Sequence, residues 1–281
     1  MITIGIMGHG FVGSATALLK CFDIDVIIYD ICPEKCDPIG TTLRDMAKCD
    51  LIFVCVPTPM MESGKCHLGI VEKAVSSLKD VIDENKTQII IRSTVPPGTS
   101  KFLNCYFMPE FLTERNWPID FKTCQHWIVG LLGKFSDYDV RIKMYTIIQK
   151  AKQNHRIDYD NLHFVLTDEA ELTKYCRNTF LSVKVSFFNE IYEYCQSKGI
   201  NFENVREMTT YDPRIGTSHS FVPGPDGKLG YGGTCFPKDT NALYYNMKEI
   251  GMESYMTKAT VERNSRVDRP IIDGDKGRAF I

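Results

Sequence analysis

The sequence predicts an α/β fold in which a doubly wound parallel sheet is followed by a long central helix and a small all-α domain. Short apolar runs alternate with amphipathic stretches through the first half of the chain, and this alternation is typical of parallel strands covered by helices on both faces. After about residue 160 only helical patterns follow. A chain of 281 residues is long enough for two domains, because a single domain usually has about 100 to 200 residues. We therefore predict one domain over residues 1–160 and a second over residues 161–281.

The first domain is predicted to contain six buried strands with helices between them. The apolar runs that indicate strands are residues 2–7, 26–29, 51–56, 88–91, 106–108 and 127–132. The amphipathic stretches that indicate helices are residues 71–82 and 142–150. Each apolar run is far shorter than the roughly 20 residues that a membrane-spanning helix needs, so we expect no membrane span.

One long helix, over residues 167–198, is predicted to link the two domains. Thr167 is suited to be its N-cap, and Gly199 is suited to end it. Shorter helices are predicted after it at residues 202–208, 239–249 and 255–266, with a loop rich in glycine and proline at residues 213–233.

The composition excludes several classes of partner. The chain has 33 basic and 35 acidic residues, a formal net charge of -2, which provides no electrostatic footprint for nucleic acid or an anionic membrane. Its eleven cysteines are scattered and odd in number, which argues against a disulfide framework and for a reducing compartment. We read no secretion signal at the N-terminus. We therefore expect a cytoplasmic enzyme with a small-molecule substrate, and we assign no metal site.

A glycine motif indicates a Rossmann-type dinucleotide site at the start of the chain. Residues 8–13 read GHGFVG, follow the first predicted strand and open a helix, as the GxGxxG motif requires. Asp30 ends the next strand, at about the spacing from which a carboxylate accepts hydrogen bonds from the ribose. Its charge would repel a 2′-phosphate, which favours NAD over NADP, although Lys35 weakens this preference. The alternative is a glycine turn followed by a surface aspartate. The residues assigned to the cofactor are Gly8, Gly10, Phe11, Val12, Gly13, Asp30 and Lys35.

A second glycine-rich loop indicates a nucleophile. Residues 230–239 read GYGGTCFPKD and deliver Cys235 to the start of a predicted helix. The helix dipole and Lys238 would lower the pKa of this thiol and favour the nucleophilic thiolate. The alternative is a packing cysteine at a turn, which is how we interpret the other ten.

At these residues the sequence resembles the UDP-glucose and GDP-mannose 6-dehydrogenase family, whose GGxCxxKD segment matches residues 232–239. Four further segments resemble motifs of that family in the same order: residues 93–99 (STVPPGT), 108–114 (MPEFLTE), 174–178 (KYCRN) and 212–216 (DPRIG). Lys174 and Asn178 are four residues apart and so share one face of the long helix with Glu171. The alternative for this face is a solvated polar stripe.

The resemblance implies two successive hydride transfers to NAD, which convert the C6 alcohol of a nucleotide sugar, with UDP-glucose as the first candidate, to a uronic acid. Cys235 would carry a thiohemiacetal and then a thioester. Lys174 and Asn178 would face the C6 oxyanion, and Asp239 would help to remove the first proton. Glu110 would be the base for thioester hydrolysis, with Thr94 positioning the water. The cofactor residues added by the resemblance are Thr58, Thr94, Glu114 and Lys238, and the substrate residues are Glu110, Phe111, Leu112, Lys174, Asn178, Arg214 and Gly232.

The chain also departs from the family pattern. It ends at Ile281, so we expect a short form without the second nucleotide-binding domain of full-length relatives. We predict a homodimer built on the long helix, through its apolar residues Leu172, Tyr175, Val183, Phe187 and Tyr194. Two other functions stay open: a two-electron β-hydroxyacid-type dehydrogenase, which would not need the cysteine, and a non-catalytic NAD-binding remnant.

Overall fold

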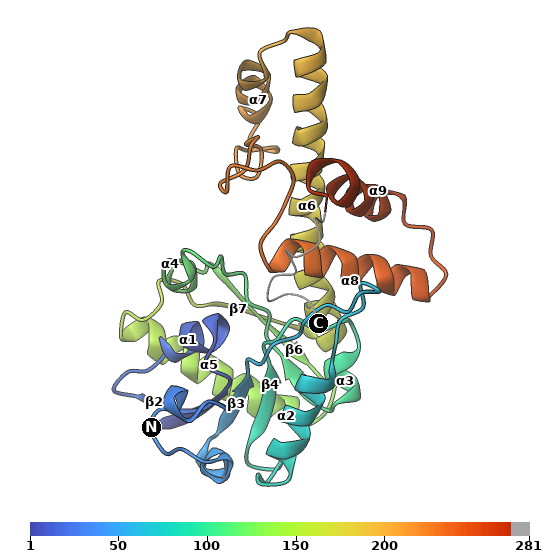
Figure 1. The fold of residues 1–281 in the computed structure, drawn as a ribbon. Coiled ribbons are helices and arrows are strands. Elements are labelled where there is room, and N and C mark those ends of the chain that lie inside the picture. The colour runs from blue at the N-terminus through green and yellow to red at the C-terminus, as the bar shows by residue number, and fades with distance from the viewer. Residues whose placement is uncertain (271–281) are drawn as a thin grey trace. The chain divides into compact units, whose positions relative to one another are not determined.

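A computed structural model describes residues 1–270. The chain divides into two compact units (Figure 1). The first unit consists of Met1–Thr58 and His67–Lys174, and the second consists of Pro59–Cys66 and the chain from Tyr175 onwards. The boundary therefore lies within the long helix α6 (Thr167–Lys198).

The first unit is built on one seven-stranded sheet. In spatial order its strands are β2 (Ile24–Tyr29), β1 (Ile2–Met7), β3 (Leu51–Val54), β4 (Gln88–Ile91), β5 (Tyr106–Phe107), β6 (His126–Leu131) and β7 (Asn161–Leu166). Neighbouring strands are parallel except for β5 and β6, where Phe107 lies opposite Gly130 in an antiparallel pair. The prediction of a doubly wound α/β fold is confirmed. The sheet was predicted to be parallel throughout, and the β5–β6 pair makes it mostly parallel instead.

Apolar side chains cover both faces of this sheet. On one face, Ala15 and Met144 pack with strand residues such as Ile4. On the other, Val71 and Val75 pack with residues such as Ile52. The helices of the first unit are α1 (Phe11–Ala17), α2 (Gly69–Lys79), α3 (Thr99–Phe102), α4 (Trp117–Lys122) and α5 (Asp137–Gln153), with 3-10 turns at Pro33–Lys35 and Leu43–Lys48.

Helix α5 and strand β7 are among the elements of the first unit that differ from the sequence prediction. Helix α5 begins at Asp137 and not at residue 142, and its first turn carries Asp137 and Asp139, whose charges suit a helix N-terminus. The Asp137 carboxylate also accepts hydrogen bonds from the backbone N–H groups of Gly133 (2.8 Å) and Lys134 (3.0 Å) in the turn before the helix. Strand β7 was not predicted, because it is the sheet's edge strand and its exposed residues interrupt any apolar run.

The second unit is helical in the described part that follows Lys174. After α6 come α7 (Phe202–Thr210), α8 (Cys235–Glu249), α9 (Tyr255–Arg263) and a π-helical turn, η3 (Asn264–Asp268). Helix α6 has the bounds that the sequence predicted, and α8 begins four residues before its prediction because a proline at 237 is tolerated in a first helical turn. Among the described residues, no helix is long and apolar enough to span a membrane.

Candidate active site

The glycine motif of residues 8–13 has the geometry of a dinucleotide loop. Gly8 has a φ of +99°, and a side chain there would also meet the carbonyl oxygen of Cys55 at 2.8 Å. A Cβ on Gly13 would collide with the carbonyl oxygen of Gly8, so α1 can approach β1 closely only with glycine here. By contrast, no heavy atom lies within 4 Å of a Cβ built on Gly10. The open space at Gly10 and the tight packing at the other two glycines fit a bound pyrophosphate.

Asp30 lies beside this loop. Its carboxylate accepts hydrogen bonds from the backbone N–H groups of His9 (2.6 Å) and Cys32 (2.9 Å). Burial raises the pKa of Asp30, but these two hydrogen bonds and the charge of Lys35 outweigh it and hold the pKa below its ordinary value. The Lys35 side chain is exposed, and the backbone carbonyl oxygen of Lys35 accepts a hydrogen bond of 2.8 Å from the His9 ring. An ionised carboxylate therefore stands next to the glycine loop.

Glu110 and Lys174 form a buried ion pair in the first unit. The Lys174 ammonium donates to the Glu110 carboxylate at 2.7 Å and to the Glu110 carbonyl oxygen at 2.5 Å. The other carboxylate oxygen accepts from the N–H of Leu112 at 2.7 Å. Burial would raise the pKa of Glu110, but Lys174, the Leu112 hydrogen bond and Arg92 together lower it. Lys174 also lies 5.6 Å from the centre of the Phe111 ring. The sequence-predicted residues of these two segments are thus in direct contact.

Arg92 is a further charged residue near Glu110, and the sequence analysis did not single it out. It is almost fully buried, at 2% exposure, and its guanidinium lies over the rings of Phe53 and Phe121 at 5.9 and 5.8 Å. Its Nε has no hydrogen-bond partner among the described residues. The sequence did contain a signal for Arg92, since it is a single cation between the apolar strand β4 and the STVPPGT segment.

Glu171 shares a helical face with Lys174 but binds a different partner. Its carboxylate accepts hydrogen bonds from the backbone N–H groups of Gly98 (2.6 Å) and Ser100 (2.8 Å). Burial raises its pKa to about 7, against the lowering effect of these hydrogen bonds. Glu171 therefore holds the segment that carries Thr94, and it has no direct bond to Lys174.

In the second unit, Asp239 is the centre of a buried polar cluster. The amide of Asn178 donates to one carboxylate oxygen of Asp239 at 2.5 Å, and the ammonium of Lys238 donates to the other at 2.5 Å. Burial disfavours the charged form of Lys238, but the charge of Asp239 and its hydrogen bond favour that form more strongly, and Cys66 and Cys235 add to this. The pKa of Lys238 is therefore raised above its ordinary value. Lys238 is therefore a cation within electrostatic range of the Cys235 thiol.

Cys235 is the first residue of α8 and is partly buried. Each of the eleven cysteines lies in the described residues, and each is a thiol. The contrast with the packing cysteines is electrostatic: burial raises the pKa of Cys105 to about 12 and that of Cys55 to about 11, whereas Cys235 lies at a helix N-terminus with a lysine nearby.

The remaining predicted site residues have varied environments. Thr58 is buried, Thr94, Leu112 and Gly232 are partly buried, and Glu114 is exposed. Arg214 is also exposed, and its guanidinium pairs with Asp212 at 2.5 Å. Among the described residues, no group of three or more side chains could hold a metal ion.

Two parts of the chain match a known protein family. Residues 39–149 match the NAD binding domain of the UDP-glucose/GDP-mannose dehydrogenase family, and residues 168–266 match its central domain. A UDP-glucose 6-dehydrogenase of Rickettsia felis is 32% identical over 258 residues, which cover 84% of this chain and 54% of the relative. The chain therefore spans about half the length of this curated relative.

Solved structures share the fold. A UDP-glucose dehydrogenase from the archaeon Pyrobaculum islandicum aligns with a TM-score of 0.79 at 25% identity, over 94% of this chain and 68% of that one. The 3-hydroxyisobutyrate dehydrogenase of Mycobacterium tuberculosis aligns with a TM-score of 0.71 at 15% identity, over 93% of this chain and 92% of that one, which shows a shared fold alone. With both family domains present in order, the chain belongs to the UDP-glucose/GDP-mannose dehydrogenase family, and its cofactor is NAD.

Proposed function

We propose that this protein oxidises the C6 alcohol of a nucleotide sugar to the uronic acid with NAD, and that UDP-glucose is the first candidate substrate. The observation that carries the proposal is the cluster at the start of α8, where Cys235 is followed within one turn by Lys238 and Asp239. A two-electron alcohol dehydrogenase has no use for a cysteine in this setting. The name of the Rickettsia relative supports the choice of sugar nucleotide.

The first oxidation would remove a proton and a hydride from the substrate alcohol. NAD, held by the glycine loop and Asp30, would supply the hydride acceptor for C6. Asp239, which accepts hydrogen bonds from Asn178 and Lys238, would take the hydroxyl proton through a water molecule. Lys174 gives two of its three N–H groups to Glu110, and we assign the third to the C6 oxygen, whose developing charge it would stabilise. The product of this step is an aldehyde.

The second oxidation would pass through covalent bonds to Cys235. The thiolate would add to the aldehyde carbon and form a thiohemiacetal, which would lose its hydroxyl proton to a base and a second hydride to a second NAD to become a thioester. Water then attacks the thioester carbon, the C–S bond breaks, and the thiolate is released with the carboxylate product. We assign the role of base in this hydrolysis to Glu110, whose lowered pKa keeps it ionised at neutral pH.

The yield of NADH per substrate tests this proposal. A screen of UDP- and GDP-sugars should find one that gives two NADH for each sugar consumed, whereas a β-hydroxyacid-type dehydrogenase gives one. Cys235→Ser should still bind NAD but form no uronic acid at a measurable steady rate, because a serine hydroxyl is far less ionised at neutral pH than a cysteine thiol. Cys105→Ser is the matched control and should turn over normally.

Two outcomes would contradict the proposal. Equal turnover by Cys235→Ser would exclude the covalent steps. Binding of NAD without NADH from any nucleotide sugar would favour the non-catalytic alternative. We further propose that the protein is a homodimer and that it works in the cytoplasm, where its cysteines stay reduced.

A further inference from the structure

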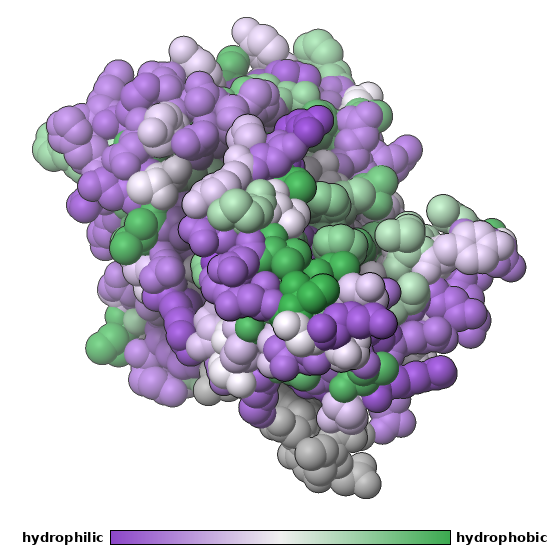
Figure 2. All heavy atoms as spheres, turned by 90° about the horizontal axis from the view of Figure 1, so that it is seen from above, coloured by the Kyte–Doolittle hydropathy of each residue, from purple (hydrophilic) through white to green (hydrophobic). Residues whose placement is uncertain are grey.

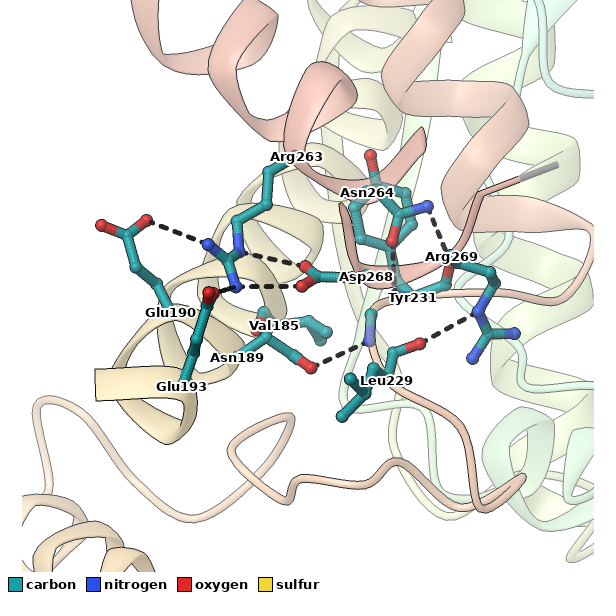
Figure 3. Close-up of polar contacts among 11 residues, drawn as sticks. Val185, Asn189, Glu190, Glu193, Leu229, Tyr231, Arg263, Asn264, Asp268 and Arg269 are labelled. Carbon is teal, nitrogen blue, oxygen red and sulfur yellow. Dashed lines mark hydrogen bonds and ion pairs between the residues drawn. The ribbon is translucent and has the colours of Figure 1, made fainter. Parts of the chain in front are cut away.

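The backbone immediately before the Cys235 loop is held by side chains from two parts of the second unit, α6 and the segment from η3 to Arg269 (Figure 3). Asn189 comes from α6, Asn264 from η3, and Arg269 directly follows η3. They bind three consecutive residues, Leu229, Gly230 and Tyr231. Only Gly232, Gly233 and Thr234 separate this run from Cys235.

Asn264 binds both backbone polar groups of Tyr231. The N–H of Tyr231 donates to Oδ1 of Asn264 at 2.8 Å, and Nδ2 of Asn264 donates to the carbonyl oxygen of Tyr231 at 3.1 Å. A backbone N–H can only donate and a carbonyl can only accept, so this pairing allows one orientation of the amide. Both residues are buried. A side chain with only acceptors cannot replace asparagine here.

Asn189 binds the preceding residue. Its Oδ1 accepts from the N–H of Gly230 at 3.0 Å, and its Nδ2 donates to the carbonyl oxygen of Val185, one turn earlier in α6, at 2.8 Å. Asn189 is 3% exposed. On the other side, Nε of Arg269 donates to the carbonyl oxygen of Leu229 at 3.1 Å.

Gly230 allows this close approach. Its φ is +65°, a conformation that favours glycine. A Cβ at this position would lie 2.8 Å from Cβ of Asp268 and would collide with Oδ1 of Asn264. The loop therefore packs against η3 with no room for a side chain.

An ion-pair cluster ties η3 to α6. The Arg263 guanidinium donates to the buried carboxylate of Asp268 at 3.0 Å and to Glu193 of α6 at 3.0 Å. Glu190 lies 3.9 Å from the same guanidinium (Figure 3). The turn that carries Asn264 is thus fixed to the helix that carries Asn189.

We propose that Asn264, supported by Asn189, is a positioning residue that fixes the loop carrying Cys235. A glycine-rich run has more conformational freedom than other backbone, while a displacement of about 1 Å at a reacting group can cost roughly 100-fold in rate. The paired hydrogen bonds to Tyr231 remove that freedom four residues before the thiol. The inference rests on the proposed function for its catalytic consequence only, since the reactivity of the thiol can be measured without any substrate.

The variant Asn264→Asp tests this inference with almost no change of shape. It keeps an acceptor for the N–H of Tyr231 but loses the donor and turns a carboxylate oxygen toward the Tyr231 carbonyl. Asn201→Asp is the matched control, because the same substitution at the exposed N-cap of α7 keeps the acceptor for the N–H of Asn204 and lies outside the contacts to the loop. Both are made in the full chain and studied with NAD bound.

The decisive measurement is the rate of Cys235 alkylation by iodoacetamide against pH, followed by mass spectrometry. In Asn264→Asp we expect the midpoint of this profile to move upward by about one pH unit, because a displaced thiol loses its interaction with Lys238 and the helix N-terminus. Asn201→Asp should keep the wild-type midpoint. For a substrate that the wild type oxidises, kcat should fall by roughly 100-fold in Asn264→Asp while KM stays within about threefold.

A wild-type alkylation profile in Asn264→Asp would overturn the inference. If that variant is unfolded at the assay temperature, Asn189→Leu takes its place, because it removes the hydrogen bond to Gly230. It should shift the alkylation profile in the same direction, and an unshifted profile in Asn189→Leu would also overturn the inference. If the wild type oxidises no nucleotide sugar but Asn264→Asp still shifts the alkylation profile, the positioning role stands and the proposed function fails.

Discussion

At the scale of single residues, we expect Asp30 to decide between the two nicotinamide cofactors. Its two backbone hydrogen bonds hold it ionised, so NADP would bring a phosphate beside an existing negative charge. We expect wild-type protein to bind NAD more tightly than NADP. Asp30→Ala should narrow the gap by about tenfold, roughly 1.4 kcal/mol.

Fluorescence titration with each cofactor measures this ratio. Glu34→Ala is a suitable control, because Glu34 is an exposed acid in the neighbouring 3-10 turn Pro33–Lys35. Tighter binding of NADP by the wild type would contradict the assignment of Asp30.

Sequence motifs could identify the candidate site residues but not all of their partners. The spacing of Lys174 and Asn178 predicted a shared helical face, and the structure pairs them with Glu110 and Asp239 respectively. These pairings join residues more than sixty positions apart, and no local periodicity contains them. Arg92 escaped notice for the same reason, because its environment is made by side chains from three other segments.

At the scale of elements, Glu171 joins α6 to the loop that precedes α3. Burial raises its pKa from 4.5 to about 7, so the folded state favours the protonated carboxyl. The resulting stability is present below pH 4.5 and is lost as the pH rises to about 7. We expect the free energy of unfolding to fall over this window, by at most about 3 kcal/mol from this group.

Glu171→Gln should flatten this dependence, because the amide does not titrate. Urea unfolding at several pH values between 4.5 and 7 measures it, with the exposed Glu72→Gln of α2 as a control. A slope in Glu171→Gln equal to that of the wild type would show that this carboxyl does not contribute.

The predicted elements were accurate where the hydrophobic pattern is strong. The six predicted strands and the helix over residues 167–198 are all present. The π-helical turn at Asn264–Asp268 was predicted as the end of an ordinary helix, because periodicity cannot distinguish a widened turn whose form depends on the loop packed against it. The antiparallel pairing of β6 depends on chain path and has no signature in the strand itself.

The membership of the second unit also escaped the sequence analysis. Pro59–Cys66 follows β3 in sequence but belongs to the second unit. Its residues Met60 and Cys66 form an antiparallel bridge, and Gly64 approaches Asn241 of α8. Such a segment can be recognised only from its contacts in space.

At the scale of the whole molecule, α6 carries an apolar face that the described residues leave exposed. Phe180, Phe187 and Tyr194 are 68%, 54% and 57% exposed, and with the partly buried Val183 they recur at the spacing of one helical face. Tyr175 is fully buried and is removed from the predicted contact surface. Apolar side chains are visible among polar ones on the surface in Figure 2. Contiguous exposed apolar groups of this kind mark protein contacts.

A second copy of the chain is the partner that we propose for this face, because a symmetric dimer covers the same face on both copies. Phe187→Glu should then convert the dimer to a monomer, since two carboxylates would be buried at the contact. Light scattering coupled to size exclusion gives the mass directly. Tyr138→Glu, on the exposed side of α5, is the matched control and should leave the mass unchanged.

The dimer also bears on Arg214, which we assign to the substrate. Arg214 is exposed, and among the interactions described it binds only its neighbour Asp212. If Arg214 acts in the partner's site, the monomeric variant should also show a higher KM for the nucleotide sugar. A wild-type protein that is monomeric and fully active would refute both the dimer and this role of Arg214.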